Sequence, residues 1–191
     1  MISYKSMLTI AISMLGSLAL RSPEATPSAP PMIVDHAYVA PAQKVVRRTA
    51  RANSDFLQAI AIFESRNQIG IVNQYGMMGK YQFSPRTVAG LGFNVTQEEF
   101  LSNESLQDSV MRRYMRFNYN KLREVIRLHN GTYRDSVYIT TAGILAGAHL
   151  MGAGGVLAYF YPDQYSHPVV DGNGVHITEY IRRFGNYSIR L

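Results

Sequence analysis

The chain has 191 residues, of which 47% are hydrophobic and 17% charged, a composition typical of one globular domain and not of a disordered chain. Cysteine is absent, which excludes disulfides, thiolate metal sites and a lipidated cysteine. The formal net charge of +6 favours contact with an anionic polymer or surface but does not select one.

Residues 1–20 predict an export signal. Lys5 precedes the apolar run Met7–Leu20, which is too short to span a bilayer comfortably and has small residues at Ser17 and Ala19. An uncleaved N-terminal anchor is the alternative, because a basic residue and a polar linker follow the run directly. Both interpretations place the rest of the chain outside the cytoplasm, in the periplasm or at the cell surface. After cleavage of the signal we expect no stable membrane insertion.

A proline-rich segment separates this signal from the folded domain. Residues 21–52 contain five of the eight prolines of the chain, spaced among Ala, Ser and Thr, as in an extended tether. The segment ends in a basic stretch that contains Arg47, Arg48 and Arg51, which we interpret as the solvated end of the linker. The sequence therefore predicts a signal at 1–20, a linker at 21–52 and one domain at 53–191.

The domain opens with a predicted amphipathic helix that ends near a carboxylate. Phe56, Ile60 and Phe63 recur at helical spacing and form one apolar stripe. Glu64 follows Ile60 by four positions and therefore lies at the edge of the buried stripe. Burial beside these side chains is expected to raise the pKa of Glu64 above its ordinary value, because desolvation disfavours the charged form.

A loop and several further helices are predicted to follow. Residues 68–83 are loop-like, with glycines at three positions that permit turns. Helices are expected at 85–91, 96–101, 105–128, 138–150 and 177–184, and the fourth of these is expected to end at the glycine cluster of residues 152–155. The DGNG sequence at 171–174 predicts a turn. Because no sustained strand alternation is present, the predicted fold class is mainly α.

The expected helix at 105–128 carries a run of basic side chains. Its inward positions are expected to be Val110, Met111, Tyr114, Met115 and Leu122. A solvated face is the ordinary interpretation of such a charge run, and a polymer-binding stripe is the alternative. The basic residues are Arg112, Arg113, Arg116, Lys121, Arg123 and Arg127.

Three short motifs occur in a fixed order between Asp55 and Val156. The pair Glu64-Ser65 closes the first helix, the segment Gly79–Thr87 reads GKYQFSPRT, and the segment Ala148–Val156 reads AHLMGAGGV. This ordered set resembles the lysozyme-like lytic transglycosylases. In that superfamily a Glu-Ser pair closes the catalytic helix, a Gly-x-x-Gln segment followed by Pro-x-Thr lines the cleft, and an Ala-Tyr-Asn-x-Gly-x-Gly-x-Val segment forms the far wall. The second motif is also similar to the Gly-x-x-Gln-Phe-Ser segment of resuscitation-promoting factors, which share the fold.

The resemblance implies a lysozyme-like helical domain that cleaves the β-1,4 bond between N-acetylmuramic acid and N-acetylglucosamine in peptidoglycan. It assigns Glu64 as general acid and then base, with the 6-hydroxyl of the muramic acid attacking to give a 1,6-anhydro product. It implies a monomer that binds glycan strands without cofactor, metal or nucleic acid. The residues that it places along the substrate are Ser65, Tyr81, Gln82, His149, Gly152 and Gly154.

The third motif departs from the family pattern. His149 and Leu150 stand where the family commonly has Tyr-Asn, so the usual contacts of that pair to the sugar or to the catalytic Glu are missing or come from other residues. A satisfied core histidine is the other interpretation of His149, and the spacing of the histidines fits no metal pattern. Tyr81 and Gln82 are equally suited to satisfying buried backbone groups.

Two other functions remain open on the sequence. A muramidase or chitinase-like hydrolase would use a second carboxylate, and none lies between Glu64 and Thr96. A non-catalytic glycan-binding or envelope-assembly module would keep the fold, and a solvent-exposed Glu64 or a cleft blocked by Tyr81 and His149 would favour it. The nearest later carboxylates are expected at capping or solvent-facing positions, namely Glu98, Glu99, Glu104 and Asp108.

Overall fold

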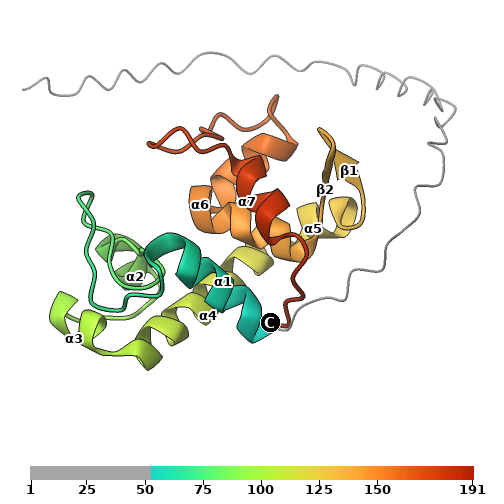
Figure 1. Cartoon of the computed structure of the whole chain (residues 1–191). Coiled ribbons are helices and arrows are strands. Elements are labelled where there is room, and N and C mark those ends of the chain that lie inside the picture. Colours follow the sequence, from blue (N-terminus) through green and yellow to red (C-terminus); the bar gives the residue numbers. More distant parts are fainter. Residues whose placement is uncertain (1–52) are drawn as a thin grey trace, which may run out of the picture. The chain divides into compact units, whose positions relative to one another are not determined.

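The computed structural model describes residues 53–191, so the expected signal at 1–20 and linker at 21–52 lie outside the described residues. The described part is mainly helical, as the sequence predicts, with one short antiparallel hairpin (Figure 1). Its elements in chain order are α1 (Asn53–Ser65), α2 (Pro85–Gly90), α3 (Gln97–Ser102), α4 (Glu104–Lys121), α5 (Arg123–His129), β1 (Tyr133–Arg134), β2 (Val137–Tyr138), α6 (Thr141–Phe160) and α7 (Ile177–Phe184).

Two clusters of buried apolar side chains form the core. The first comes mainly from α1, the loop before α2, α4, α6 and α7, and the second from α5, the hairpin, α6 and α7. Helices α6 and α7 contribute to both clusters and therefore join the two halves of the domain. The chain after α7 returns to the start of α1 (Figure 1), where the ring of Tyr187 packs on Phe56.

Helix α6 is the central apolar element. A Cβ atom at Gly143 would lie 2.8 Å from the carbonyl oxygen of Ile181, and one at Gly147 would lie 3.0 Å from the side chain of Ile177. The absence of a side chain at both positions lets α7 approach closely. Among the described residues α6 is also long and apolar enough to cross a membrane, but most of it is buried inside the fold, as in the core helix of a globular domain.

Two of the expected helices have different bounds in the structure. The helix expected at 105–128 is divided at Leu122, whose φ of −104° and ψ of 13° are not helical. The helix expected at 138–150 starts only at Thr141, after the hairpin, and continues through the glycine cluster to Phe160. It bends at Gly152, where φ is 69°, because glycine adopts a positive φ without steric cost.

The shorter helices agree with the sequence. Helices α2, α3 and α7 begin and end within one residue of the expected ranges. The capping box before α3 is formed in both directions, since Thr96 Oγ1 accepts from the N–H of Glu99 while the Glu99 carboxylate accepts from the N–H of Thr96. Local sequence signals therefore determine these three elements.

Candidate active site

Glu64 lies in the last turn of α1, four residues after the fully buried Ile60, as its spacing predicts. Its side chain is 17% exposed. Phe63, expected in the buried stripe, is instead 43% exposed. At about 100° per residue, Phe63 and Glu64 fall on opposite sides of Ile60, and in this fold the Glu64 edge of the stripe is the more deeply buried of the two. The Phe63 ring packs at the edge of α7, beneath the guanidinium of Arg183.

Two side chains from other helices point at the same oxygen of Glu64. The hydroxyl of Tyr180 on α7 donates a hydrogen bond of 2.7 Å to Oε1, and Nε2 of His149 on α6 lies 3.5 Å from Oε1. The first motif and the third motif of the sequence are therefore brought together. Tyr180 was not predicted, because a tyrosine on the apolar side of an amphipathic helix cannot be distinguished from a core aromatic by its sequence.

The electrostatic balance at Glu64 corrects the sequence-based expectation. Burial raises the pKa of Glu64. The hydrogen bond and charge of His149 and the hydrogen bond of Tyr180 lower it, and together they outweigh burial, so the pKa lies below its ordinary value. The expectation of a raised pKa is wrong because it counted the apolar neighbours on α1 and not the two donors. Burial and the adjacent carboxylate raise the pKa of Tyr180, so the phenol stays protonated and remains a donor.

A second carboxylate near Glu64 comes from the predicted turn at 171–174. The negative charge of Asp171 raises the pKa of both Glu64 and Tyr180. Asp171 is held in place because its Oδ1 accepts hydrogen bonds from the backbone N–H groups of Asn173 and Val175. The hydroxyl of Tyr75, in the loop before α2, donates to Asn173 Oδ1 at 3.3 Å, so the two loops reach toward each other (Figure 1).

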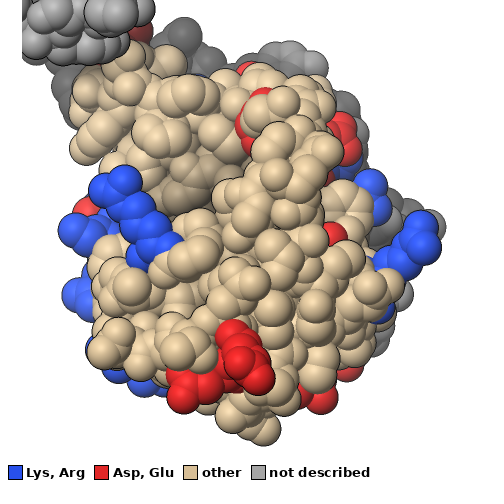
Figure 2. All heavy atoms as spheres, turned by 90° about the vertical axis from the view of Figure 1, so that its left-hand side faces the viewer, with Lys and Arg blue, Asp and Glu red and all other residues tan. Residues whose placement is uncertain are grey.

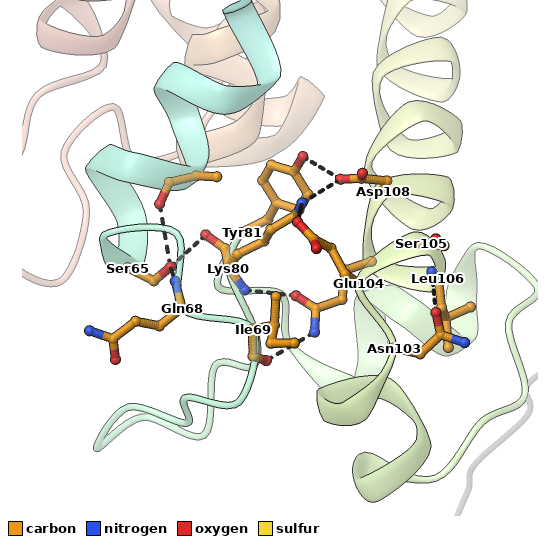
Figure 3. A network of polar contacts seen from close by, with 12 residues as sticks. Ser65, Gln68, Ile69, Lys80, Tyr81, Asn103, Glu104, Ser105, Leu106 and Asp108 are labelled. Atoms are coloured by element: carbon orange, nitrogen blue, oxygen red, sulfur yellow. Dashed lines mark hydrogen bonds and ion pairs between the residues drawn. The ribbon is translucent and has the colours of Figure 1, made fainter. Parts of the chain in front are cut away.

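Ser65 and Tyr81 are buried and do not line an open surface, which corrects their assignment as substrate contacts. Ser65 Oγ donates to the carbonyl oxygen of Lys80 at 2.9 Å and accepts from the N–H of Gln68. Tyr81 is 2% exposed, and its hydroxyl donates to Asp108 at 2.7 Å. Ser65 therefore bonds to backbone groups of the loop, and Tyr81 bonds from this loop to α4 (Figure 3).

The same loop is fixed to α4 by further buried polar contacts (Figure 3). The side chain of Lys80 is 3% exposed, and its Nζ lies 2.7 Å from Glu104 and 2.9 Å from Asp108. The fully buried Gln107 accepts from the N–H of Lys80 and donates to the carbonyl oxygens of Ile69 and Phe100. Glu104 is 56% exposed, as expected, whereas the side chain of Asp108 is only 27% exposed, and both carboxylates hold the Gly79–Thr87 motif in position.

The remaining predicted contacts differ in their exposure. Gln82 is half-buried, and its amide donates to the carbonyl oxygen of Gly79 within the same loop. Gly154 is half-buried, and a Cβ atom there would lie 2.9 Å from the ring of His167, so the missing side chain lets the loop after α6 approach the helix. Its assignment as a substrate contact stays a prediction. No atom lies within 4 Å of the position that a Cβ atom of Gly152 would take, so the space beside this residue is open. The role of Gly152 that the structure shows is the bend in α6.

A cavity of about 570 Å³ lies along the second half of α6 and the loop that follows. No carboxylate lines it, and neither do Glu64, His149 or Tyr180, so we place the candidate reactive site at Glu64 and not in this cavity. Within residues 53–191 no group of three His, Asp or Glu side chains is placed to hold a metal ion. The cavity is lined by Ala158, Tyr159, Pro162, Tyr165, Ser166, His167, Pro168 and Val169.

No protein-family model, curated protein or solved structure matches this chain. The class of reaction is therefore inferred from the Glu64 cluster and from the order of the three motifs.

Proposed function

We propose that this chain is an exported lytic transglycosylase that cleaves the bond between N-acetylmuramic acid and N-acetylglucosamine in peptidoglycan. The observation that carries the proposal is the placement of Glu64 at the end of α1. Its carboxylate is largely buried, and Tyr180 and His149 both point at its Oε1 atom. Oε2 is then the oxygen left for the substrate. Glycosidic cleavage requires such a carboxyl group, which first donates a proton and then accepts one.

A single carboxyl group serves both steps, first as the proton donor and then as the proton acceptor. In the first step protonated Glu64 gives its proton to the bridging oxygen, the bond from C1 of the muramic acid to that oxygen breaks, and the sugar ring becomes oxocarbenium-like. In the second step the Glu64 carboxylate takes the proton of the 6-hydroxyl while O6 bonds to C1. The 1,6-anhydro product leaves and Glu64 is again protonated. Between the steps the carboxylate is stabilised by the hydroxyl of Tyr180.

The test is the digestion of purified peptidoglycan, with the soluble products identified by mass spectrometry. We expect muropeptides with 1,6-anhydro ends. The absence of any soluble product, from a folded protein that still sediments with the wall, would replace the proposal with a glycan-binding module. The largely buried setting of Glu64 argues against such a module.

One observation favours a muramidase-type hydrolase as a second candidate. Asp171 brings a second negative charge to Glu64, and in hydrolases a second carboxylate activates water or stabilises the oxocarbenium ion. Free reducing ends in the same digest would support it. Asp171→Asn keeps the Oδ1 acceptor of the turn and removes the charge, so in a hydrolase it should lower the release of reducing ends by about 100-fold.

The pH dependence is expected to differ between kcat/KM and kcat. Glu64 must be protonated for the first step, and its pKa in the free protein is lowered, so kcat/KM should fall with rising pH from below the ordinary Glu value of about 4.3. A bound glycan covers the exposed part of Glu64 and adds desolvation, which raises the pKa in the complex. The alkaline limb of kcat should therefore lie at higher pH than that of kcat/KM.

Initial rates on soluble glycan chains between about pH 3 and about pH 9 measure both limbs. A value of kcat/KM that keeps rising to the end of this range would show that Glu64 is not the proton donor.

The basic side chains of α4 and α5 are expected to raise affinity for the anionic wall. All six are exposed, and Leu122 divides them into a group on α4 and a group on α5. On the face shown in Figure 2 uncharged residues occupy the centre, with Lys and Arg toward its two sides. Because exposed charges are screened over about 10 Å at 0.1 M salt and about 3 Å at 1 M, binding should weaken steeply over this range.

Sedimentation of the Glu64→Gln protein with intact wall measures this dependence without lysis. Replacing Arg112, Arg113 and Arg116 together by Gln should reduce the salt dependence, because three of the six exposed basic side chains are then lost. Wall binding that does not change with salt would identify these residues as a solvated face only.

A further inference from the structure

The ring of His149 is fixed by aromatic contacts from two other elements. It packs edge-on against Phe83, in the loop before α2, at 5.5 Å between centroids, and against Tyr114 of α4 at 5.9 Å. The hydroxyl of Tyr114 also donates to the backbone carbonyl oxygen of Ala148, the residue before His149. The His149 side chain is 5% exposed, so the ring has no room to turn away from Glu64.

The two ring nitrogens of His149 have different surroundings. Nε2 lies 3.5 Å from Glu64 Oε1, while Nδ1 is buried without a hydrogen-bond partner. An ionised carboxylate only accepts hydrogen bonds, so the proton of the ring that faces Glu64 lies on Nε2. The separation is longer than an ordinary N–H···O bond, and catalytic hydrogen bonds of this kind shorten when a substrate closes the site.

The other groups around the pair do not replace this donor. Helix α7 contributes Tyr180, which donates to Oε1, and Arg183, whose charge acts on Tyr180. The loop between α6 and α7 contributes Asp171, whose negative charge opposes the carboxylate. Helix α4 contributes Tyr114, whose hydroxyl is already engaged by the Ala148 carbonyl.

We infer that His149 is a positioning residue, which holds Glu64 as a carboxylate between the two proton transfers by donating Nε2–H to Oε1. This inference rests on the proposed function of Glu64. In this role His149 is not the donor or the acceptor of the proton that is transferred to and from the sugar. It stabilises the form of Glu64 that the first step creates and the second step consumes, and it therefore lowers the energy of an intermediate state without contacting the sugar.

The inference is tested by replacing His149 with side chains that lack a hydrogen-bond donor and with one that keeps a donor. His149→Phe keeps the edge-on packing and removes the donor, and His149→Leu is a second variant without a donor should Phe disturb the fold. His149→Gln keeps an N–H that can reach Oε1. His129→Phe is the matched control, because the His129 ring packs at 4.4 Å between centroids on Phe160, the last residue of α6 and 11 positions after His149. Circular dichroism and thermal melts establish that each variant is folded.

The first readout is the titration of the Glu64 carboxyl carbon by NMR, assigned by its absence from the Glu64→Gln protein. His149 lowers the pKa of Glu64, so the titration should move to higher pH in the Phe and Leu variants, return part of the way in the Gln variant and stay unchanged in the control. A Glu64 titration that is unchanged in folded His149→Phe protein overturns the inference.

The second readout is the rate of wall cleavage. We expect kcat to fall about 100-fold in the Phe variant at unchanged KM, as for the loss of one donor to a developing charge, and to recover at least partly in the Gln variant. A rise in KM at unchanged kcat would make His149 a substrate contact and overturn the inference. The titration of Glu64 needs no activity, so it tests the contact with His149 even if the intact protein lyses no wall. Absence of lysis would reject the proposed function and would leave the result of the titration unchanged.

Discussion

The Glu64→Gln variant is expected to lose peptidoglycan lysis by at least about 1,000-fold in kcat while keeping its fold. The amide is nearly isosteric with the carboxyl group, and its oxygen can still accept from the hydroxyl of Tyr180 and from Nε2 of His149. It cannot give a proton to the leaving oxygen or take one from the attacking hydroxyl. Clearance of turbid wall suspensions, together with circular dichroism, measures both parts of the expectation.

Glu179→Gln is the matched control for this variant. Glu179 precedes Tyr180 on α7, is exposed and pairs with Arg182 at the surface, so its replacement should change neither lysis nor stability by much. Wall clearance at the normal rate by folded Glu64→Gln protein would show that the chemistry lies elsewhere. Loss of lysis in both variants would indicate a general effect of charge.

The position of Glu64 could be predicted because it depends on neighbours within one turn of helix. The spacing from Phe56 to Ile60 fixes which side of α1 is buried, and Glu64 follows from it. Its pKa could not be predicted in the same way. That property depends on Tyr180, which lies 116 positions away in the sequence, and on His149, and only the packing of α6 and α7 brings both to Oε1.

The roles of the second motif were also beyond local reasoning. A Lys and a Tyr next to a glycine look alike whether they line a cleft or satisfy a buried loop. In the structure Lys80 and Tyr81 both bond to α4, and Ser65 of the first motif bonds to the backbone of Lys80. The resemblance of the three ordered motifs predicted that this segment lies near Glu64, but the packing of α4 determines which of its side chains remain at the surface.

The amide of Gln107 is expected to be the polar group on which the fold of this loop depends most. It makes three hydrogen bonds to backbone groups, one accepted from Lys80 and two donated to Ile69 and Phe100, and it is fully buried. Gln107→Leu leaves these groups buried without partners, at about 1–3 kcal/mol each. We expect the free energy of unfolding to fall by about 3–5 kcal/mol and Tm by about 10 °C.

Urea unfolding followed by circular dichroism measures this loss. Gln58→Leu is the matched control, because Gln58 is an exposed residue of α1 and the same replacement there should change stability by less than about 0.5 kcal/mol. A decrease of under about 1 kcal/mol for Gln107→Leu would mean that water or a shifted loop satisfies the three backbone groups.

Gln107→Glu separates the loss of the donor from the loss of shape. The variant keeps an oxygen for the N–H of Lys80 but turns acceptors toward the carbonyl oxygens of Ile69 and Phe100. Its protonated acid can donate to only one of them, and its ionised form to neither. The destabilisation should therefore grow as pH rises and the acid ionises, whereas that of Gln107→Leu should not change with pH. Since Ser65, the residue after Glu64, bonds to Lys80 in this loop, wall lysis by both variants should fail at a lower temperature than that of the intact protein.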